Sequence, residues 1–293
     1  MKKKILVFSN GEKIGDGIIK LKLLYEIKNR LPDYELIWIT NKGKTVYSDI
    51  LKYVSSKYID VIYEQANLSP FFWNKISKKY KLENEYFDYI LDTQKSVLRT
   101  IALKRINHRI FISGSANFIF SSKKIKKSLN NKYYLNYILE LLNLIVFKKV
   151  VTDFKIPISV NLEKLIGNIL IKKNSYIGIA PGAGEKNKIW PLENFFRICK
   201  YIESKNKIIV FFIGPDELYL KDKLNKLYPN SIFIEDHITT YNNIEIIMAT
   251  TKFLSLAISN DSGVSHMLST GYCPLIKLLV LKIQKNLHQK IEI

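Results

Sequence analysis

The sequence contains few cysteines and lacks a long apolar run. Its two cysteines, Cys199 and Cys273, lie far apart without metal-ligand spacing, so they predict neither a disulfide framework nor a zinc site. A membrane-spanning helix needs roughly 18 uninterrupted apolar residues, and the nearest candidate, residues 138–147, is interrupted by Glu140 and Asn143. The apolar run at the amino end is too short for the core of a signal peptide. These absences predict a cytoplasmic protein.

Negative charge is scarce as well. The chain has 46 Lys and Arg against 26 Asp and Glu, a formal net charge of +20. Such an excess suits an anionic partner such as a nucleotide, a phospholipid or a nucleic acid. Because no recognised DNA- or RNA-binding motif occurs, no nucleic-acid partner is expected.

A basic segment at residues 123–149 interleaves lysines with Tyr133, Tyr134 and Tyr137. One interpretation is a surface that meets an acidic membrane or a charged acceptor. The alternative is a solvated helix with its lysines outward and its tyrosines half buried, which is more typical of this pattern. The lysines concerned are Lys123, Lys124, Lys126, Lys127, Lys132, Lys148 and Lys149.

Strand-like apolar runs alternate with segments of helical spacing along the chain. The runs are residues 5–8, 36–40, 61–63, 89–92, 109–113, 176–180, 208–213, 232–234 and 253–258. Such alternation predicts mostly parallel sheets covered on both faces. It lapses around Pro157 and Gly167. We therefore expect two similar doubly wound α/β domains, residues 1–155 and 175–293, joined by a linker at 156–174 and facing each other across a cleft.

The stretch at residues 176–191, YIGIAPGAGEKNKIWP, has the features of a phosphate-binding loop. An apolar strand ends in a Gly-rich turn, and Pro191 precedes a segment of helical spacing. A loop between a strand's carboxyl end and a helix's amino end offers free N–H groups and the helix dipole to an anion. Lys186 and Lys188 would add positive charge. An ordinary βα loop with solvated lysines has the same pattern.

Three loops of the second half follow strands and carry polar or glycine residues: 183–188, 214–217 and 260–263. In a parallel sheet all three open on the same edge, so they are expected to surround one ligand. Residues 218–227 are expected to form the helix after the second loop. Asp261 could equally cap the helix that starts at Ser262. His266 lies one turn further on, where a lone histidine is more often packed or solvated than functional.

A nicotinamide-dependent oxidoreductase is a competing interpretation of paired α/β domains. The dinucleotide fingerprint requires a third glycine after its first two. Lys20 stands at that position in the run from Gly15, and Asn187 does so in the run from Gly182. The sequence therefore argues against this class.

Three motifs together resemble the signatures of family 9 glycosyltransferases, the heptosyltransferases of lipopolysaccharide core assembly. They are Gly15-Asp16 with the following leucines, the APGAG run with Lys188-Ile189-Trp190-Pro191, and Asn260-Asp261-Ser262-Gly263-Val264-Ser265-His266. The resemblance spans most of the chain in the right order. It implies a GT-B fold, two Rossmann-like domains with the donor held mainly by the second.

The resemblance also implies an activity. A heptose-type sugar would pass, with inversion, from a nucleotide-sugar donor resembling ADP-heptose to a lipid-linked saccharide of the lipopolysaccharide core. The reaction would take place at the cytoplasmic face of the inner membrane, where peripheral contact is possible, and would need no cofactor. No Asp-x-Asp sequence occurs in the chain, which argues against a donor bound through a metal.

The resemblance assigns roles residue by residue. Asp16 matches the general base that takes a proton from the attacking hydroxyl. The remaining matches are donor-binding: Ala183, Gly184 and Lys188 at the diphosphate, Ser262 and Gly263 opposite them, Asp261 at sugar hydroxyls, Glu217 at the ribose, and His266.

The end of the sequence departs from the family. After Cys273-Pro274 the family continues through a strand into a loop rich in Gly, Pro and Thr, whereas residues 277–293 contain no Gly or Pro. The carboxyl-terminal part is therefore expected to be truncated or altered. This leaves open a non-catalytic nucleotide-binding remnant of the same fold.

Overall fold

The chain forms two compact units, Met1–Pro157 and Ile158–Ile293, which are described separately. The computed structural model describes residues 2–125, 133–148, 153–171 and 175–279. Within these residues, no helix combines the length and apolar character needed to cross a bilayer.

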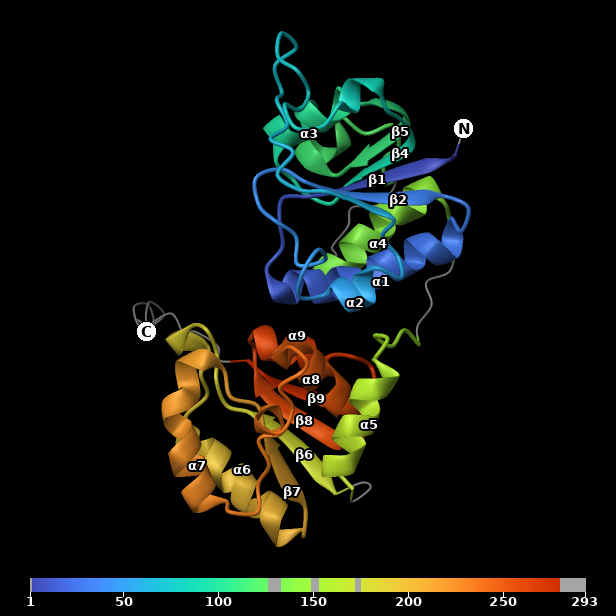
Figure 1. Cartoon of the computed structure of the whole chain (residues 1–293). Helices are drawn as coiled ribbons and strands as arrows, with labels where there is room; N and C mark the ends of the chain where they lie inside the picture. Colours follow the sequence, from blue (N-terminus) through green and yellow to red (C-terminus); the bar gives the residue numbers. More distant parts are fainter. Residues whose placement is uncertain (1, 126–132, 149–152, 172–174, 280–293) are drawn as a thin grey trace, which may run out of the picture. The chain divides into compact units, whose positions relative to one another are not determined.

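The first unit is a five-stranded parallel sheet with helices on both faces (Figure 1). Its strands, in the order β3-β2-β1-β4-β5, are β1 (Lys4–Ser9), β2 (Glu35–Thr40), β3 (Val61–Tyr63), β4 (Tyr86–Asp92) and β5 (Asn107–Ser113). Its helices are α1 (Ile14–Arg30), α2 (Lys52–Ser55), α3 (Val97–Lys104) and α4 (Tyr134–Ile145), with 3-10 turns η1 (Leu82–Asn84) and η2 (Ser115–Phe118). Helices α1 and α4 cover one face and α3 covers the other.

Hydrophobic burial explains why these segments form this sheet. Strand β1 lies in the middle, and its apolar residues from Ile5 to Phe8 are fully buried, as expected for a parallel strand covered on both sides. Phe8 joins a core cluster with Ile39, Ile90 and Phe111 from three other strands. The predicted strands of this half are therefore confirmed, with one to three more residues at several ends.

The second unit is a parallel sheet of four strands in the order β7-β6-β8-β9. The strands are β6 (Tyr176–Ala180), β7 (Ile208–Phe211), β8 (Leu254–Asn260) and β9 (Leu275–Leu278). The helices are α5 (Val160–Ile169), α6 (Leu192–Ser204), α7 (Lys221–Leu227), α8 (Asn243–Thr250) and α9 (Gly263–Leu268), with 3-10 turns η3 (Lys186–Lys188), η4 (Pro215–Leu220), η5 (Ile234–Asp236) and η6 (Thr251–Phe253). Helices α6 and α7 cover one face and α5, α8 and α9 the other (Figure 1).

One local prediction for this unit was wrong. Residues 232–234 form no strand, because Ile232 makes a single bridge to Val210 and the chain then turns into η5. Phe233 and Ile234 are both buried, and Phe233 packs in the core cluster of this unit. The expected helix at 218–227 is confirmed, with its first residues at the end of the 3-10 turn η4 and the rest in α7.

The range 156–174, expected as a linker, contains helix α5. This helix begins at Ser159, whose side chain accepts a hydrogen bond from the backbone N–H of Leu162, and its buried residues include Leu162 and Ile166. It packs against α8. These contacts assign α5 to the second unit.

Candidate active site

Asp16 lies in the first turn of α1, directly after the loop that leaves β1. The loop passes through Gly11, whose φ of +104° is favourable only for glycine. A side chain there would also crowd the backbone of Gly43 and Lys44, each 3.1 Å from an added Cβ. The Asp16 carboxylate is exposed, and the helix dipole favours a negative charge in this first turn.

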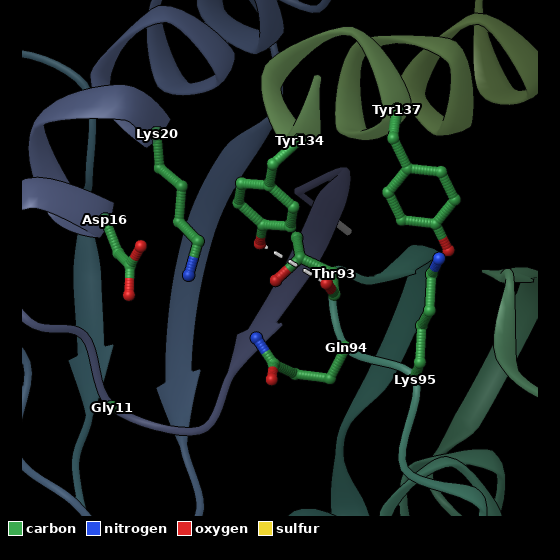
Figure 2. A pocket seen from close by; sticks show the side chains of 8 residues that line it. All are labelled: Gly11, Asp16, Lys20, Thr93, Gln94, Lys95, Tyr134 and Tyr137. Carbon is green, nitrogen blue, oxygen red and sulfur yellow. Dashed lines mark hydrogen bonds between the residues drawn. The ribbon is translucent and has the colours of Figure 1, made fainter. Parts of the chain in front are cut away.

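Asp16 borders a pocket of about 450 Å³ within the first unit. The pocket is built by the first two turns of α1, by the segment after β4 and by one face of α4 (Figure 2). Its lining residues are Gly11, Asp16, Lys20, Thr93, Gln94, Lys95, Tyr134 and Tyr137. One carboxylate and two ammonium groups therefore meet at a single polar cavity.

Lys20 lies one helical turn after Asp16 and is buried. Its ammonium donates a hydrogen bond to the Ser9 hydroxyl at 2.8 Å and pairs with the buried Glu12 carboxylate at 3.9 Å. Burial lowers the pKa of Lys20, while the charges of Glu12 and Asp16 raise it. The ring of Trp38 lies 6.0 Å from the Lys20 ammonium. Lys20 thus carries a partly desolvated charge on the pocket wall beside Asp16.

The α4 tyrosines form the opposite wall. The Tyr134 hydroxyl donates to the backbone carbonyl of Thr93 at 3.4 Å, and the Lys95 ammonium lies 4.4 Å from the centre of the Tyr137 ring. Burial raises the pKa of Tyr134 and of Tyr137 to about 12, so both hydroxyls stay protonated at neutral pH. A Cβ on Gly114 would overlap the Tyr137 hydroxyl, so this wall requires glycine at that position.

The basic segment at 123–149 therefore contributes tyrosines to this wall. Tyr137 is buried, Tyr134 is 37% exposed and Tyr133 is 72% exposed, so the three tyrosines are not uniformly half-buried. Lys123, Lys124 and Lys148 are exposed. The other lysines of the segment, Lys126, Lys127, Lys132 and Lys149, lie outside the described residues.

Asp92 fixes the segment that carries Gln94 and Lys95. It is buried at the end of β4 and accepts hydrogen bonds from the hydroxyls of Thr100 and Ser113 at 2.7 and 2.8 Å. The Gln94 backbone N–H also donates to it at 2.9 Å. Burial raises the pKa of Asp92 to about 6, although these hydrogen bonds lower it. We assign Asp92 a structural role, because its hydrogen bond from the Gln94 backbone positions the segment that lines the pocket.

In the second unit, Asn260 ties the predicted phosphate loop to the end of β8. Its side-chain amide donates to the carbonyl of Pro181 at 2.6 Å and to that of Gly182 at 3.5 Å. Its side-chain oxygen accepts from the backbone N–H of Trp190 at 3.1 Å. Both ends of the loop between β6 and α6 are thus fastened by one fully buried residue.

Glu217 is brought against the same loop. It is buried, and its carboxylate lies so close to Gly182 and Gly214 that a Cβ on either would stand within 2.6 Å of it. The loops that begin after β6 and β7 therefore meet at Glu217, and a side chain at either glycine would displace its carboxylate. This confirms that two of the three polar loops of the second half lie on one sheet edge, and Asn260 adds the third.

The remaining predicted donor residues lie on these loops. Lys188 pairs with Glu185 at 3.1 Å, and Asp261 pairs with Lys277 of β9 at 3.2 Å. Ala183 is buried, whereas Gly184 and Gly263 are exposed and have no atom within 4 Å of an added Cβ. Ser262 precedes α9, and its backbone N–H and carbonyl bond the Ser265 hydroxyl. His266 is half-buried in that short helix.

A sequence model of glycosyltransferase family 9 (heptosyltransferase) matches residues 51–278. The chain belongs to this family. The match covers most of the first unit and ends with β9 of the second, just before residues 280–293, which lie outside the described part of the chain. Strand β9 is the strand through which the family was expected to continue after Cys273-Pro274.

Known proteins agree with this family 9 assignment. The lipopolysaccharide core heptosyltransferase OpsX of Haemophilus influenzae is 20% identical over 274 residues, which are 90% of this chain and 76% of that protein. The crystal structure of a family 9 glycosyltransferase from Veillonella parvula gives a TM-score of 0.67 at 16% identity, covering 94% of this chain and 81% of that one. Heptosyltransferase WaaC of E. coli, solved with ADP-2-deoxy-2-fluoro heptose, gives 0.63 at 14% identity, with 94% and 88% covered.

These solved structures confirm the predicted fold class. The family 9 chain has the GT-B architecture, in which each unit is a Rossmann-like parallel sheet with helices on both faces. Asp16 belongs to the first unit and the predicted donor residues to the second. Within the described residues, no group of three or more His, Cys, Asp or Glu is arranged to hold a metal ion.

The sequence did not identify Lys20, Gln94, Lys95 or Asn260 as functional candidates in this family 9 chain. The i, i+4 spacing of Asp16 and Lys20 was the available signal for Lys20. Asn260 stood inside a recognised motif but without a role of its own. No sequence pattern marked Gln94 and Lys95 as site residues, because only the tertiary structure places the segment after β4 beside α1.

Replacing Asn260 with alanine tests the connection between β8 and the phosphate loop. The change would leave the buried carbonyl of Pro181 without its partner, which costs about 1–3 kcal/mol, and would also remove the part-buried hydrogen bond from the N–H of Trp190. We expect a lower midpoint of chemical unfolding and weaker nucleotide affinity together. Asn225→Ala, which replaces an exposed asparagine on α7 of the same unit, is the control and should lower neither. Unaltered nucleotide affinity in Asn260→Ala would mean that the loop keeps its shape without this amide.

Proposed function

We propose that this chain transfers a heptose-type sugar from a nucleotide-sugar donor resembling ADP-heptose to a saccharide acceptor of the lipopolysaccharide core. Membership of family 9 supports sugar transfer. The names of its relatives support the sugar and the acceptor: OpsX is a lipopolysaccharide core heptosyltransferase, and WaaC was solved with a fluorinated ADP-heptose. The observation that carries the proposal is Asp16 at the edge of a polar pocket in the first unit.

The acceptor hydroxyl would bind in the Asp16 pocket. Asp16 takes the hydroxyl proton as that oxygen forms a bond to the anomeric carbon of the donor. The bond from that carbon to the diphosphate breaks at the same time, and the nucleoside diphosphate leaves. A single displacement inverts the anomeric configuration, and one carboxylate is sufficient for it. Lys20 and Lys95 would hold acidic or hydroxyl groups of the acceptor beside Asp16.

The donor would bind at the loops of the second unit. Lys188 and the exposed backbone of Gly184 would meet the diphosphate, whose negative charge grows as it leaves. Ser262 and Gly263 would approach it from the end of β8. Glu217 would accept hydrogen bonds from the ribose, and Asp261 would bind sugar hydroxyls. Ala183 and His266 complete the proposed donor set, and the mechanism uses no metal or cofactor.

The first experiment is a thermal-shift screen of the purified protein against nucleotide sugars, followed by transfer assays with core saccharide acceptors. A ligand that binds only the folded protein raises its melting temperature by mass action, so ADP-containing donors should give the largest shifts. Larger shifts with UDP- or GDP-sugars than with ADP-sugars would contradict the proposed donor. Binding of ADP without transfer to any core acceptor would contradict the proposed reaction.

Lys188→Ala tests the proposed diphosphate contact. Loss of one charged hydrogen bond should weaken ADP binding by about 1–3 kcal/mol, measured by titration calorimetry. The control is Lys200→Ala, which removes an exposed lysine of the same unit on α6 and should leave the affinity unchanged. If both variants bound ADP with equal affinity, Lys188 would not be part of the donor site.

A further inference from the structure

Three consecutive large aromatic residues lie on the surface of the first unit, between β3 and η1. Phe71, Phe72 and Trp73 are 50%, 83% and 68% exposed. Single exposed apolar residues are common, but a contiguous group of this size usually marks an interaction site. The proposed transfer reaction gives these residues no role.

The segment that carries them, residues 69–76, is a closed loop that we call the aromatic tip. The backbone N–H of Ser69 donates to the carbonyl of Ile76 at 3.0 Å, and that of Asn74 donates to the carbonyl of Phe71 at 3.2 Å. The chain is anchored on both sides, because Leu68 and Ile76 are buried in the core of the unit. Figure 1 shows this blue-green loop projecting past α3.

Arg105, at the end of α3, holds the tip in its shape. Its guanidinium donates to the backbone carbonyls of Ser69 at 2.7 Å and Asn74 at 2.6 Å, and to that of Phe72 at 3.5 Å. Without these bonds the three carbonyl groups would have to form hydrogen bonds with water instead. The exposed aromatic side chains are therefore displayed by an ordered backbone.

The aromatic rings pack on one another and leave their outer faces uncovered by described residues. Trp73 stacks on Phe71 with ring centres 5.0 Å apart, and Phe72 meets Trp73 edge-on at 4.8 Å. The result is one continuous apolar surface. Burying it would remove a large apolar area from water, which is a strong driving force for association.

Several lysines lie near the aromatic tip in the sequence. Exposed lysines follow the aromatic residues directly, and another lies at the end of α3 beside Arg105. They are Lys75, Lys78, Lys79, Lys81 and Lys104. The ammonium groups of Lys79 and Lys104 also donate to the backbone carbonyls of Glu64 and Phe120. Aromatic side chains with lysines beside them suit the interface of an anionic bilayer, where Trp lies among the headgroups and Lys meets lipid phosphates. The net charge of +20 favours the same partner.

We propose that the aromatic tip inserts into the headgroup region of an anionic phospholipid bilayer, with Phe72 and Trp73 as its main anchors. This surface differs from the basic segment at 123–149 that the sequence suggested for membrane contact. It would hold the protein beside a lipid-linked acceptor, but its test requires neither donor nor acceptor. Failure of membrane binding is therefore distinguishable from failure of sugar transfer.

The test uses tryptophan fluorescence with phospholipid vesicles. Trp73 is exposed, whereas Trp38 is fully buried and Trp190 is half-buried in the second unit. Vesicles of phosphatidylcholine with phosphatidylglycerol should shift the emission to shorter wavelength, and Trp73→Phe should remove the shift. Raising the salt concentration should weaken binding, because the lysine contribution is screened. No shift, or an equal shift with pure phosphatidylcholine, would overturn the proposal.

Vesicle sedimentation with matched double variants tests the anchors. Replacing Phe72 and Trp73 together by serine should weaken partitioning by about ten-fold or more, given the apolar area lost. The control replaces Leu218 and Tyr219, also consecutive and exposed but in the second unit, by serine and should partition normally. Equal losses in both would overturn the proposal. So would self-association in analytical ultracentrifugation that the Phe72/Trp73 variant abolishes, because a second copy would then be the occupant.

Discussion

Replacing Asp16 with asparagine is expected to lower kcat for sugar transfer by roughly 10²- to 10⁴-fold, the usual contribution of a general base. Asparagine has the same size and is accommodated on the exposed first turn of α1, but it cannot take the proton from the acceptor hydroxyl. Because Asp16 belongs to the first unit and the proposed donor residues to the second, affinity for the donor nucleotide should be unchanged. Initial rates of nucleoside diphosphate release and titration calorimetry with ADP would separate the two quantities.

The matched control for this experiment is Asp33→Asn. Asp33 is an exposed aspartate of the same unit, but it does not line the pocket. Its replacement removes the same charge and should leave kcat and nucleotide affinity near their wild-type values. If Asp16→Asn transferred sugar as fast as Asp33→Asn, another group would have to accept the proton.

Replacing Lys20 with methionine is expected to lower the free energy of unfolding by about 3–5 kcal/mol, as for other broken buried ion pairs. The side chains of Lys20 and Glu12 are 3% and 0% exposed. Without Lys20, the Glu12 carboxylate would keep a hydrogen bond from the Thr45 hydroxyl but would lose the cation beside it. Urea unfolding of the variant measures the cost.

A double-mutant cycle shows whether the cost comes from the stranded charge. Glu12→Gln in the Lys20→Met background removes that charge, so most of the lost stability should return. Lys13→Met, which replaces an exposed lysine next to α1, is the control for the lysine-to-methionine change. A Lys20→Met variant as stable as Lys13→Met would show that the buried pair does not stabilise the unit.

The alternating sheet architecture could be predicted because the relevant signals are local. A short apolar run such as 5–8 or 61–63 predicts a strand whatever its position in a parallel sheet. Strands β1 and β3 contain these two runs. The strand prediction at 232–234 failed because the chain turns into η5 after the single bridge between Ile232 and Val210. Tertiary packing decided that segment, and no local pattern reports it.

The candidate sites were predictable to different degrees for the same reason. The meeting of the loops that contain residues 183–188, 214–217 and 260–263 could be predicted, since parallel strands bring such loops to one edge. The place of Lys20 in the pocket could not, because a lysine in a helix is normally solvated, and its burial depends on Ser9, Glu12 and Trp38 from separate segments. The carboxyl-terminal departure falls on residues 277–293, of which 280–293 lie outside the described part of the chain.

The three hydrogen bonds made by Asn260 have a thermodynamic consequence for ligand capture. They fix the loop between β6 and α6 during folding, so the conformational entropy of that loop is lost before any nucleotide arrives. A diphosphate bound at this loop, as proposed, would meet a preorganised receptor, and more of its interaction energy would remain available as affinity. Association would be a lock-and-key event at this loop, without coupled folding.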